Sequence, residues 1–329
     1  MRRREFVSLL GGAMSGAMWP GRGLALSPLK RPLIGFLALT SKVRGEQFFS
    51  GFPAGMRSFG YLEGRDFGFE ARYADGDITR LFLLAEDLVR LKPDVIVAGP
   101  TDSVLALRKA TATIPIVGVN LTNAVESGLI LSETRPGTNV TGSLIHFEGS
   151  ADELLEVAHS LGPSVGAVGI FVDVGNPLSV KRREAAVTAT TKFGLQLIPA
   201  EVQTAEDIGR AFQALQRAHV RVVIVGPDCL YLTMRRQIAA YALASKILTI
   251  NYFREPVEAG GGLAYGIDLH ASYARAAHFA IKILNGQRPS DLPVDPPPAS
   301  KLWINQTTAQ AIGLTIPAML LSRAAEVVE

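Results

Sequence analysis

Residues 95–102 read VIVAGPTD, and residues 222–228 read VVIVGPD. Each stretch is an apolar run, a Gly-Pro turn and a polar residue. Each is followed by a helical pattern and a second apolar run, IPIVGVN at 114–120 and ILTINY at 247–252. Short runs of consecutive apolar residues are typical of strands buried on both faces, as in parallel sheets. The two stretches therefore predict two similar α/β units.

The same alternation continues along the chain. Strands are predicted at 32–39, 67–73, 94–98, 114–120, 165–172, 195–200, 220–225 and 247–251. Helices are predicted between them at 46–60, 77–91, 101–111, 151–161, 178–193, 205–218 and 230–244. Strands that alternate with helices form parallel sheets, because the right-handed crossover helix lets successive strands align. The fold class predicted is α/β, with two doubly wound parallel-sheet lobes joined by a hinge.

The end of the chain is predicted to cross between the lobes more than once. We expect crossings near residues 142–148, 260–263 and 289–298, followed by a strand at 301–305 and a helix from Thr307 with a break near Pro317. The first lobe is then predicted to hold residues 32–145 and 263–288. The second lobe is predicted to hold residues 146–262 and 289–329.

The N-terminus has the parts of a secretory signal peptide. The basic head MRRREF precedes a short apolar segment, and the small residues of Gly23-Leu24-Ala25 offer a cleavage site. The pair Arg3-Arg4 resembles the twin-arginine export motif. We predict a signal peptide over residues 1–25, and hence a soluble periplasmic protein. The alternatives left open are general secretory export and an uncleaved tail.

The charge of the chain lies in that leader. The chain has 33 basic and 30 acidic residues, and residues 1–25 contain four arginines against Glu5, which leaves 29 of each sign. A neutral mature chain gives no reason to expect nucleic-acid binding. The doublets Arg182-Arg183 and Arg235-Arg236 are interpreted as solvated helix surface. Cys229 is the only cysteine, so the sequence predicts neither an internal disulfide nor a thiolate metal cluster.

The chain also resembles a known family along nearly its whole length. The segments that carry the resemblance include FGYLEGRDFGFEARYADGD, LVRLKPDVIVA, RPGTNVTG, FREPVEAGGGLAYGIDL, ILNGQRPSDLPV and INQTTAQAIGLTIP. They are similar to the ABC-transporter substrate-binding proteins of the tryptophan/tyrosine type. The resemblance implies a type I periplasmic binding fold, an inner-membrane permease as partner, and an aromatic amino acid as ligand. A related aromatic or branched carboxylate is the alternative ligand.

Polar residues that follow strands in the first lobe are candidates to bind a ligand carboxylate. Thr40 and Ser41 follow the first strand, and Thr101 and Asp102 open a helix. Helix N-terminal N–H groups and hydroxyls bind carboxylates. The alternative for the Ser and Thr residues is a helix N-cap, and a capped helix still offers free N–H groups.

Asp228 is the candidate partner for a ligand ammonium group, because it ends an apolar strand and matches an aspartate of the family pattern. An N-cap is the alternative. Asn120 and Asn176 follow strands and are candidates for hydrogen bonds to the ligand, with a plain turn as the alternative for Asn176. Tyr231 and Tyr252 are candidates to stack on a ligand ring, although an aromatic residue is more often part of a core.

Catalytic motifs are absent from the sequence. It contains no GxSxG elbow, no GxxxxGK[ST] phosphate loop and no GxGxxG after a strand, and its histidines are scattered. We predict a monomeric binding protein that is not an enzyme and uses no cofactor or metal. The alternative function is a periplasmic ligand-sensing domain that signals to a membrane receptor.

Overall fold

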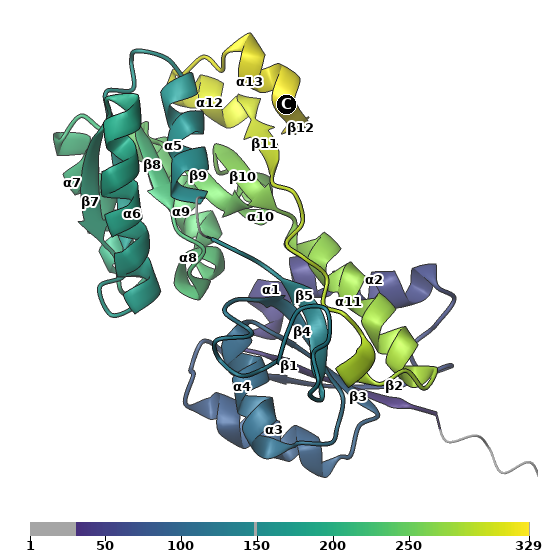
Figure 1. Ribbon diagram of the computed structural model, residues 1–329. Coiled ribbons are helices and arrows are strands. Elements are labelled where there is room, and N and C mark those ends of the chain that lie inside the picture. Colours follow the sequence, from purple (N-terminus) through teal and green to yellow (C-terminus); the bar gives the residue numbers. More distant parts are fainter. Residues whose placement is uncertain (1–30, 148–149, 329) are drawn as a thin grey trace, which may run out of the picture. The chain divides into compact units, whose positions relative to one another are not determined.

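The computed structural model describes residues 31–147 and 150–328, so the predicted signal peptide lies outside the described residues. The first sheet has five parallel strands in the order β2-β1-β3-β4-β5 (Figure 1). They are β1 (Leu33–Ala38), β2 (Gly68–Tyr73), β3 (Val95–Gly99), β4 (Ile116–Leu121) and β5 (Val140–Leu144). We call this sheet and the helices packed on it the first lobe.

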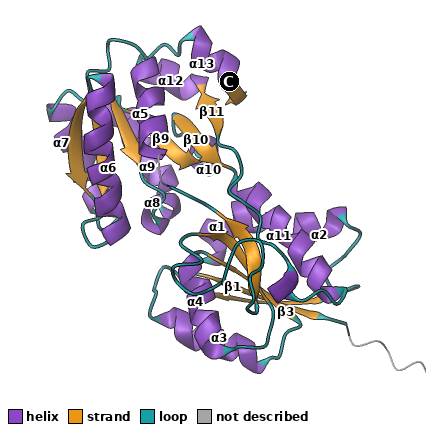
Figure 2. Ribbon diagram, viewed as in Figure 1, coloured by secondary structure: helices purple, strands orange, loops and turns teal. Residues whose placement is uncertain are grey.

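Helices cover both faces of the first sheet, as Figure 2 shows. α3 (Arg80–Arg90) and α4 (Thr101–Ala110) pack together on one face. α1 (Lys42–Phe49) and α2 (Gly51–Ser58) lie on the other face with α11 (Leu269–Leu284). The single helix predicted at 46–60 is two helices, which meet at Ser50. Pro53 lies in the first turn of α2, where its missing N–H breaks no helical hydrogen bond.

The second sheet repeats the topology of the first. Its order is β12-β11-β10-β9-β8-β6-β7, and β7-β6-β8-β9-β10 is the same parallel arrangement as β2-β1-β3-β4-β5. The strands are β6 (Ala167–Val172), β7 (Gln196–Glu201), β8 (Val222–Val225), β9 (Leu248–Phe253), β10 (Leu263–Ile267), β11 (Lys301–Asn305) and β12 (Ala324–Val328). The predicted fold class, two doubly wound parallel-sheet lobes, is therefore confirmed.

The second sheet and its helices form the second lobe. These helices are α5 (Ser150–Ser160), α6 (Pro177–Phe193), α7 (Asp207–Arg217), α8 (Cys229–Thr233), α9 (Arg235–Ser245), α10 (Glu255–Glu258), α12 (Gln306–Ile312) and α13 (Ala318–Arg323). The amphipathic α7 buries Ile208, Phe212 and Leu215 against the sheet.

The predicted lobe boundary near residue 263 needs a correction. Residues 263–267 form β10, which pairs with β9 and β11 in the second sheet, so the chain crosses to the first lobe only at Asp268. The last return follows the turn η1 (Pro289–Asp291), because Asp295 still pairs with Ser143 of β5. β11 runs antiparallel to β10, a pairing that strand–helix alternation does not reveal.

The predicted helix at the end of the chain is also only partly right. α12 and α13 are present, but residues 324–328 form β12, parallel to β11. The segment AAEVV is short, and its last two valines favour an extended backbone over a helix.

Candidate functional site

The strand order fixes where a ligand is expected. In each sheet the order reverses beside the first strand of the lobe, between β1 and β3 and between β6 and β8. Open α/β sheets bind ligands at the carboxyl ends of the strands at such a switch point. Thr40 follows β1 and Thr101 follows β3, while Asn176 follows β6 and Asp228 follows β8. Four residues singled out from the sequence thus lie at the two switch points.

Asp228 is the centre of the group in the second lobe. Its Oδ2 lies 2.5 Å from Arg182 Nη2, and its Oδ1 accepts a hydrogen bond of 2.5 Å from Asn176 Nδ2. Only 5% of the Asp228 side chain and 14% of the Arg182 side chain are exposed. A buried carboxylate needs such partners, because burial without them is costly. Asp228 is therefore already paired by residues of its own lobe.

Asn176 makes two side-chain hydrogen bonds within the second lobe, neither of which was predicted from the sequence. It is the N-cap of α6, where its Oδ1 accepts from Leu178 N at 3.0 Å, and its Nδ2 donates to Asp228. The cap fixes the side chain, so the amide is held toward β8. Asp228 itself stands at the N-cap position of α8, but its side chain makes no capping bond.

In the first lobe, two threonines join the ends of β3 and β4. Thr101 Oγ1 lies 3.1 Å from Thr122 Oγ1 and accepts from Thr122 N at 3.0 Å. Thr101 is the first residue of α4 rather than its N-cap, which is Pro100. Asp102, the second residue of α4, is exposed to solvent. Nearby protein atoms nevertheless remove part of the water around its carboxyl group, and this desolvation raises the pKa of that group. A carboxylate at this helix N-terminus opposes the binding of a second anion there.

Cys229 connects the two groups. It begins α8 in the second lobe and packs against the core cluster of the first lobe that contains Ala98 and Val104. Burial, together with the negative charges of Asp228 and Asp102, raises the pKa of its thiol to about 12. Both carboxylates, one from each lobe, are thus close to the same side chain. The switch points of the two lobes meet around Cys229.

Thr40 and Ser41 also lie near the region around Cys229 where the two lobes meet. Thr40 Oγ1 is 3.3 Å from Thr233 Oγ1, at the end of α8. Ser41 is the N-cap of α1, and its Oγ accepts from Arg44 N at 3.3 Å. The capping role left open for Ser41 is therefore the one that the structure shows.

Asn120 does not join the Asp228 group. Its backbone adopts a φ of 54°, and its N–H donates to Ser143 Oγ at 3.1 Å. It lines a separate cavity of about 390 Å³ beside the crossing segments, with Asp268, Arg275 and Asp295. Arg275 and Asp295 pair with each other at 2.5 Å, and Asp268 pairs with Arg254 at 3.1 Å, so these three charged groups have partners within the protein.

The two candidate tyrosines are core residues. Tyr231 is 1% exposed, contacts Phe171 and donates from its hydroxyl group to Val202 O at 3.0 Å, so we remove it from the candidate site. The register of the short helix α8 turns Tyr231 inward, which its sequence position alone does not reveal. Tyr252, on β9, is 5% exposed and meets Phe147 edge to face.

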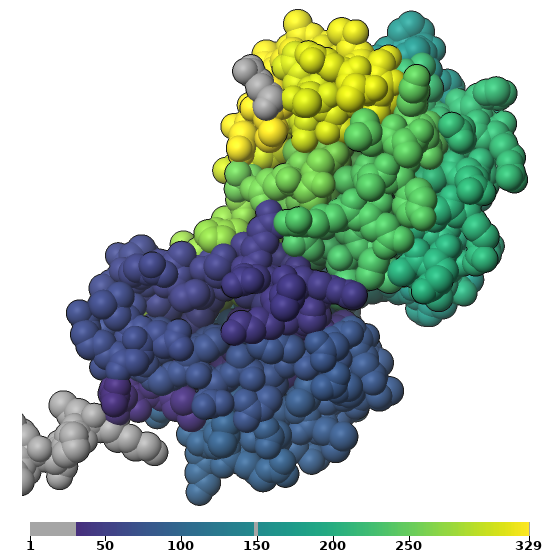
Figure 3. Space-filling model, turned by 180° about the vertical axis from the view of Figure 1, so that it is seen from behind, coloured from purple at the N-terminus to yellow at the C-terminus, as the bar shows by residue number. Residues whose placement is uncertain are grey.

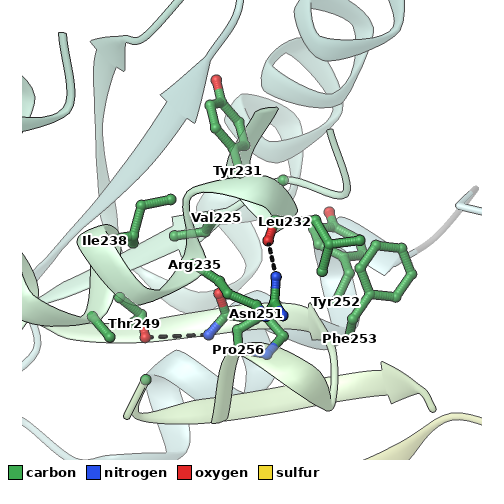
Figure 4. Close-up of a pocket in the computed structure, with 13 residues that line it drawn as sticks. Val225, Tyr231, Leu232, Arg235, Ile238, Thr249, Asn251, Tyr252, Phe253 and Pro256 are labelled. Atoms are coloured by element: carbon green, nitrogen blue, oxygen red, sulfur yellow. Dashed lines mark hydrogen bonds between the residues drawn. The ribbon is translucent and has the colours of Figure 1, made fainter. Parts of the chain in front are cut away.

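Both tyrosines line a cavity of about 10 Å³, room for one water molecule (Figure 4). Figure 4 also shows Arg235 donating to Leu232 O and Asn251 donating to Thr249. An amino-acid side chain does not fit in this space.

Two arginines with interior contacts, Arg182 and Arg235, were not predicted as candidates from the sequence. Both belong to doublets that we interpreted as solvated surface, but Arg235 is buried and the Arg182 side chain is only 14% exposed, whereas Arg236 is exposed. Their position beside Asp228 and beside α1 depends on tertiary packing. Arg182 follows the Asn176 cap by six residues in the sequence, but spacing along a helix alone does not identify Asp228 as its partner.

Other kinds of site find no support in the described part of the chain. Residues 31–147 and 150–328 contain no group of three or more His, Cys, Asp or Glu side chains that could hold a metal ion. Across the same residues no helix combines the length and apolarity that a membrane span needs.

Two lobes of one topology, with polar groups at both switch points, define a bilobal α/β ligand-binding protein. The chain belongs to the family described as ABC transporter substrate binding protein, whose model matches residues 38–328. This confirms the resemblance of the sequence to the substrate-binding proteins of ABC transporters.

Several relatives are similar over most of the chain. A tyrosine-binding protein of Clostridioides difficile (strain R20291) is 26% identical over 285 residues, which are 87% of this chain and 82% of that protein. A conserved domain protein of Vibrio cholerae has a TM-score of 0.78 and 27% identity, over 91% of this chain and 100% of that one. The ABC domain in complex with L-Trp from Streptococcus pneumonia has a TM-score of 0.78 and 24% identity, with the same coverage.

Proposed function

We propose that this protein is the exported, periplasmic binding component of an ABC importer. It captures an aromatic amino acid, or a related aromatic or branched carboxylate, between its lobes and delivers it to an inner-membrane permease. Closure about the hinge is its mechanism, and it performs no chemistry on the ligand. It works as a monomer and uses no cofactor.

The observation that carries this proposal is the pair of carboxylates around Cys229. Asp228 comes from the second lobe and Asp102 from the first, and both act on the same thiol. An ammonium group placed between them compensates both negative charges, and it does so only when the lobes are together. This gives an amino acid a larger affinity for the closed conformation than for the open one.

The carboxylate of the ligand requires donors nearby. The guanidinium group of Arg182 lies against Asp228 and can donate to a ligand carboxylate. Because Asp228 is paired and buried in this structure, binding through it requires Arg182 to turn from Asp228 toward the ligand. The printed ligands of the relatives, tyrosine and L-Trp, support an aromatic side chain.

The test is calorimetric titration of the purified chain with L-tyrosine, L-tryptophan, L-phenylalanine, L-leucine and 3-(4-hydroxyphenyl)propionate, which is tyrosine without its amino group. We expect one or more of the aromatic amino acids to bind and the compound without the amino group to bind at least about tenfold more weakly. Equal binding of that compound would rule out the ammonium role, and no binding of any aromatic compound would rule out the ligand class.

Variants locate the site in the same titration. Asp228→Asn and Asp102→Asn are each expected to weaken amino-acid binding about tenfold or more, whereas Asp291→Asn, at an exposed position far along the chain, leaves it unchanged. If Asp102→Asn has no effect, the ligand does not lie between the two carboxylates.

A further inference from the structure

Hydrogen bonds join α1 of the first lobe to α9 and α10 of the second lobe. Arg235 Nη1 donates to Arg44 O at 3.0 Å, and Arg235 Nη2 donates to Gln47 Oε1 at 3.1 Å. Gln47 Nε2 in turn donates to Glu258 Oε2. In the space-filling view the purple surface of the α1 region meets the green surface of the α9–α10 region (Figure 3). We call this set of contacts the α1 clasp.

Arg235 is the buried member of the clasp. It is 8% exposed, and burial lowers the pKa of its guanidinium group, although the charges of Glu255 and Glu258 act in the opposite direction. Its third acceptor is Leu232 O, at 3.0 Å in its own lobe, and no partner is found for its Nε among the described residues. A buried guanidinium group that donates to neutral oxygens depends on each of them. Two of the three belong to the other lobe.

The clasp lies apart from the polar groups proposed to touch the ligand. None of its hydrogen bonds involves Asp228, Asn176, Thr101 or Asp102. Its effect on a ligand therefore passes through the position of the lobes. When the lobes separate, Arg235 keeps its bond to Leu232 O and exchanges its bonds to α1 for water.

We propose that Arg235 is a positioning residue that stabilises the conformation in which the lobes touch, and that it thereby raises ligand affinity without contacting the ligand. The apparent affinity of a protein for its ligand is proportional to the fraction of molecules that are in the binding conformation. The part of this inference that concerns affinity depends on the proposed function. The part that concerns the lobes does not.

Small-angle X-ray scattering of the ligand-free protein tests whether Arg235 stabilises the conformation in which the lobes touch. Arg235→Gln removes the guanidinium donors of the second lobe, and Gln47→Ala removes one of their two acceptors in the first lobe, while Arg44 O remains. Arg236→Gln is the matched control, since it removes the same charge from the exposed neighbour in the sequence. We expect both clasp variants, but not the control, to increase the radius of gyration. The double variant should increase it by less than the sum of the two single changes, because both changes remove the hydrogen bond between Arg235 and Gln47.

An unchanged radius of gyration in Arg235→Gln would overturn the proposal, and Arg235→Met, which keeps the apolar stem of the side chain but has no donor, takes its place if Arg235→Gln fails to fold. Titration with L-tyrosine tests whether Arg235 raises ligand affinity. We expect affinity to fall about tenfold in both clasp variants and to stay unchanged in Arg236→Gln. Unchanged affinity in expanded variants would overturn the link to binding. If the parent does not bind L-tyrosine, that choice of ligand fails, and the scattering result still decides the role of Arg235.

Discussion

Arg182 Nη2 lies 2.5 Å from Asp228 Oδ2, and Arg182 is the one cationic partner that the described structure gives to this buried carboxylate. Asn176 holds the other oxygen, so the pair is fixed at two points. In a substrate-binding protein this arrangement has two consequences. It compensates the charge of a buried carboxylate, and it places a guanidinium group and a carboxylate side by side, which suits the amino-acid ligand that we propose.

The first prediction concerns the cost of breaking that pair. Arg182→Gln leaves Asp228 buried with Asn176 as its one remaining partner, so we expect unfolding free energy to fall by about 2–4 kcal/mol. Arg182→Gln combined with Asp228→Asn should lose less than the sum of the single changes, because no uncompensated charge remains. Urea unfolding measures both. Arg183→Gln is the control, since its nearest carboxylate oxygen, on Glu184, is 3.9 Å away. An additive double variant would show that the pair is not coupled.

The second prediction is a dependence of stability on pH. Glu255 Oε1 accepts from Leu269 N at 2.8 Å and from His270 N at 3.1 Å, at the start of α11, while Oε2 is buried without a hydrogen-bond partner among the described residues. Burial raises the pKa of Glu255 from 4.5 to about 7, although the backbone N–H groups of Glu255 itself, His270 and Leu269 act against the increase. The folded protein therefore keeps this proton at a pH where the unfolded chain releases it.

The sign of the effect follows from that difference. The contribution of Glu255 to stability is full below about pH 4.5 and is lost as the pH rises through about 7, with a slope of at most about 1.4 kcal/mol per pH unit. Glu255→Gln should flatten this part of the profile of unfolding free energy against pH. Glu86→Gln, on the exposed face of α3, should not change it. An identical slope in the parent and in Glu255→Gln would contradict the prediction.

The third prediction concerns the contact between α2 and α11. A Cβ atom at Gly55 would lie 2.4 Å from Ala274 O and 2.9 Å from Ala277 Cβ, so the two helices approach at a distance that only glycine allows. Gly55→Ala should lower unfolding free energy by about 1–3 kcal/mol, despite the better helix propensity of alanine. Gly166→Ala, where a Cβ meets nothing within 4 Å, serves as the control in thermal unfolding. Equal melting temperatures for the two variants would show that the helices can adjust.

Local sequence was sufficient to predict most of the fold. The apolar runs at 95–98 and 222–225 are buried strands, and the turn that follows each one carries a polar residue to a switch point. The lobe membership of β10 could not be predicted in the same way. β10 pairs with β11, which lies 33 residues further on, and the helix α11 between them packs on the other lobe. The sequence carries no signal for a pairing across such an excursion.

The site was predicted less completely, and the reason is visible in one helix. Asn176 could be found because it follows a strand and precedes proline, which are features of local sequence. Arg182 could not be found, because a cation inside an amphipathic helix resembles solvated surface until the tertiary fold brings Asp228, 46 residues later in the chain, against it. Tyr231 shows the opposite error, since its position beside Asp228 suggested a ligand contact and the turn of α8 buries its ring.

The last prediction tests whether Tyr231 is a core residue or a residue of the ligand site. Its hydroxyl group donates to Val202 O, and burial raises the pKa of that group, so it remains a donor across the accessible pH range. Tyr231→Phe removes the donor and leaves a buried carbonyl oxygen without it, and we expect a loss of about 1–2 kcal/mol in unfolding free energy. Affinity for an aromatic amino acid should not change, because the ring stays in place and faces Phe171 and Phe212 in the core. Tyr241→Phe, at an exposed tyrosine of α9, is the matched control for the chemical change. Urea unfolding and calorimetric titration of the same samples give both quantities. A variant that keeps its stability but loses affinity would return Tyr231 to the ligand site, and with it the original interpretation of the sequence.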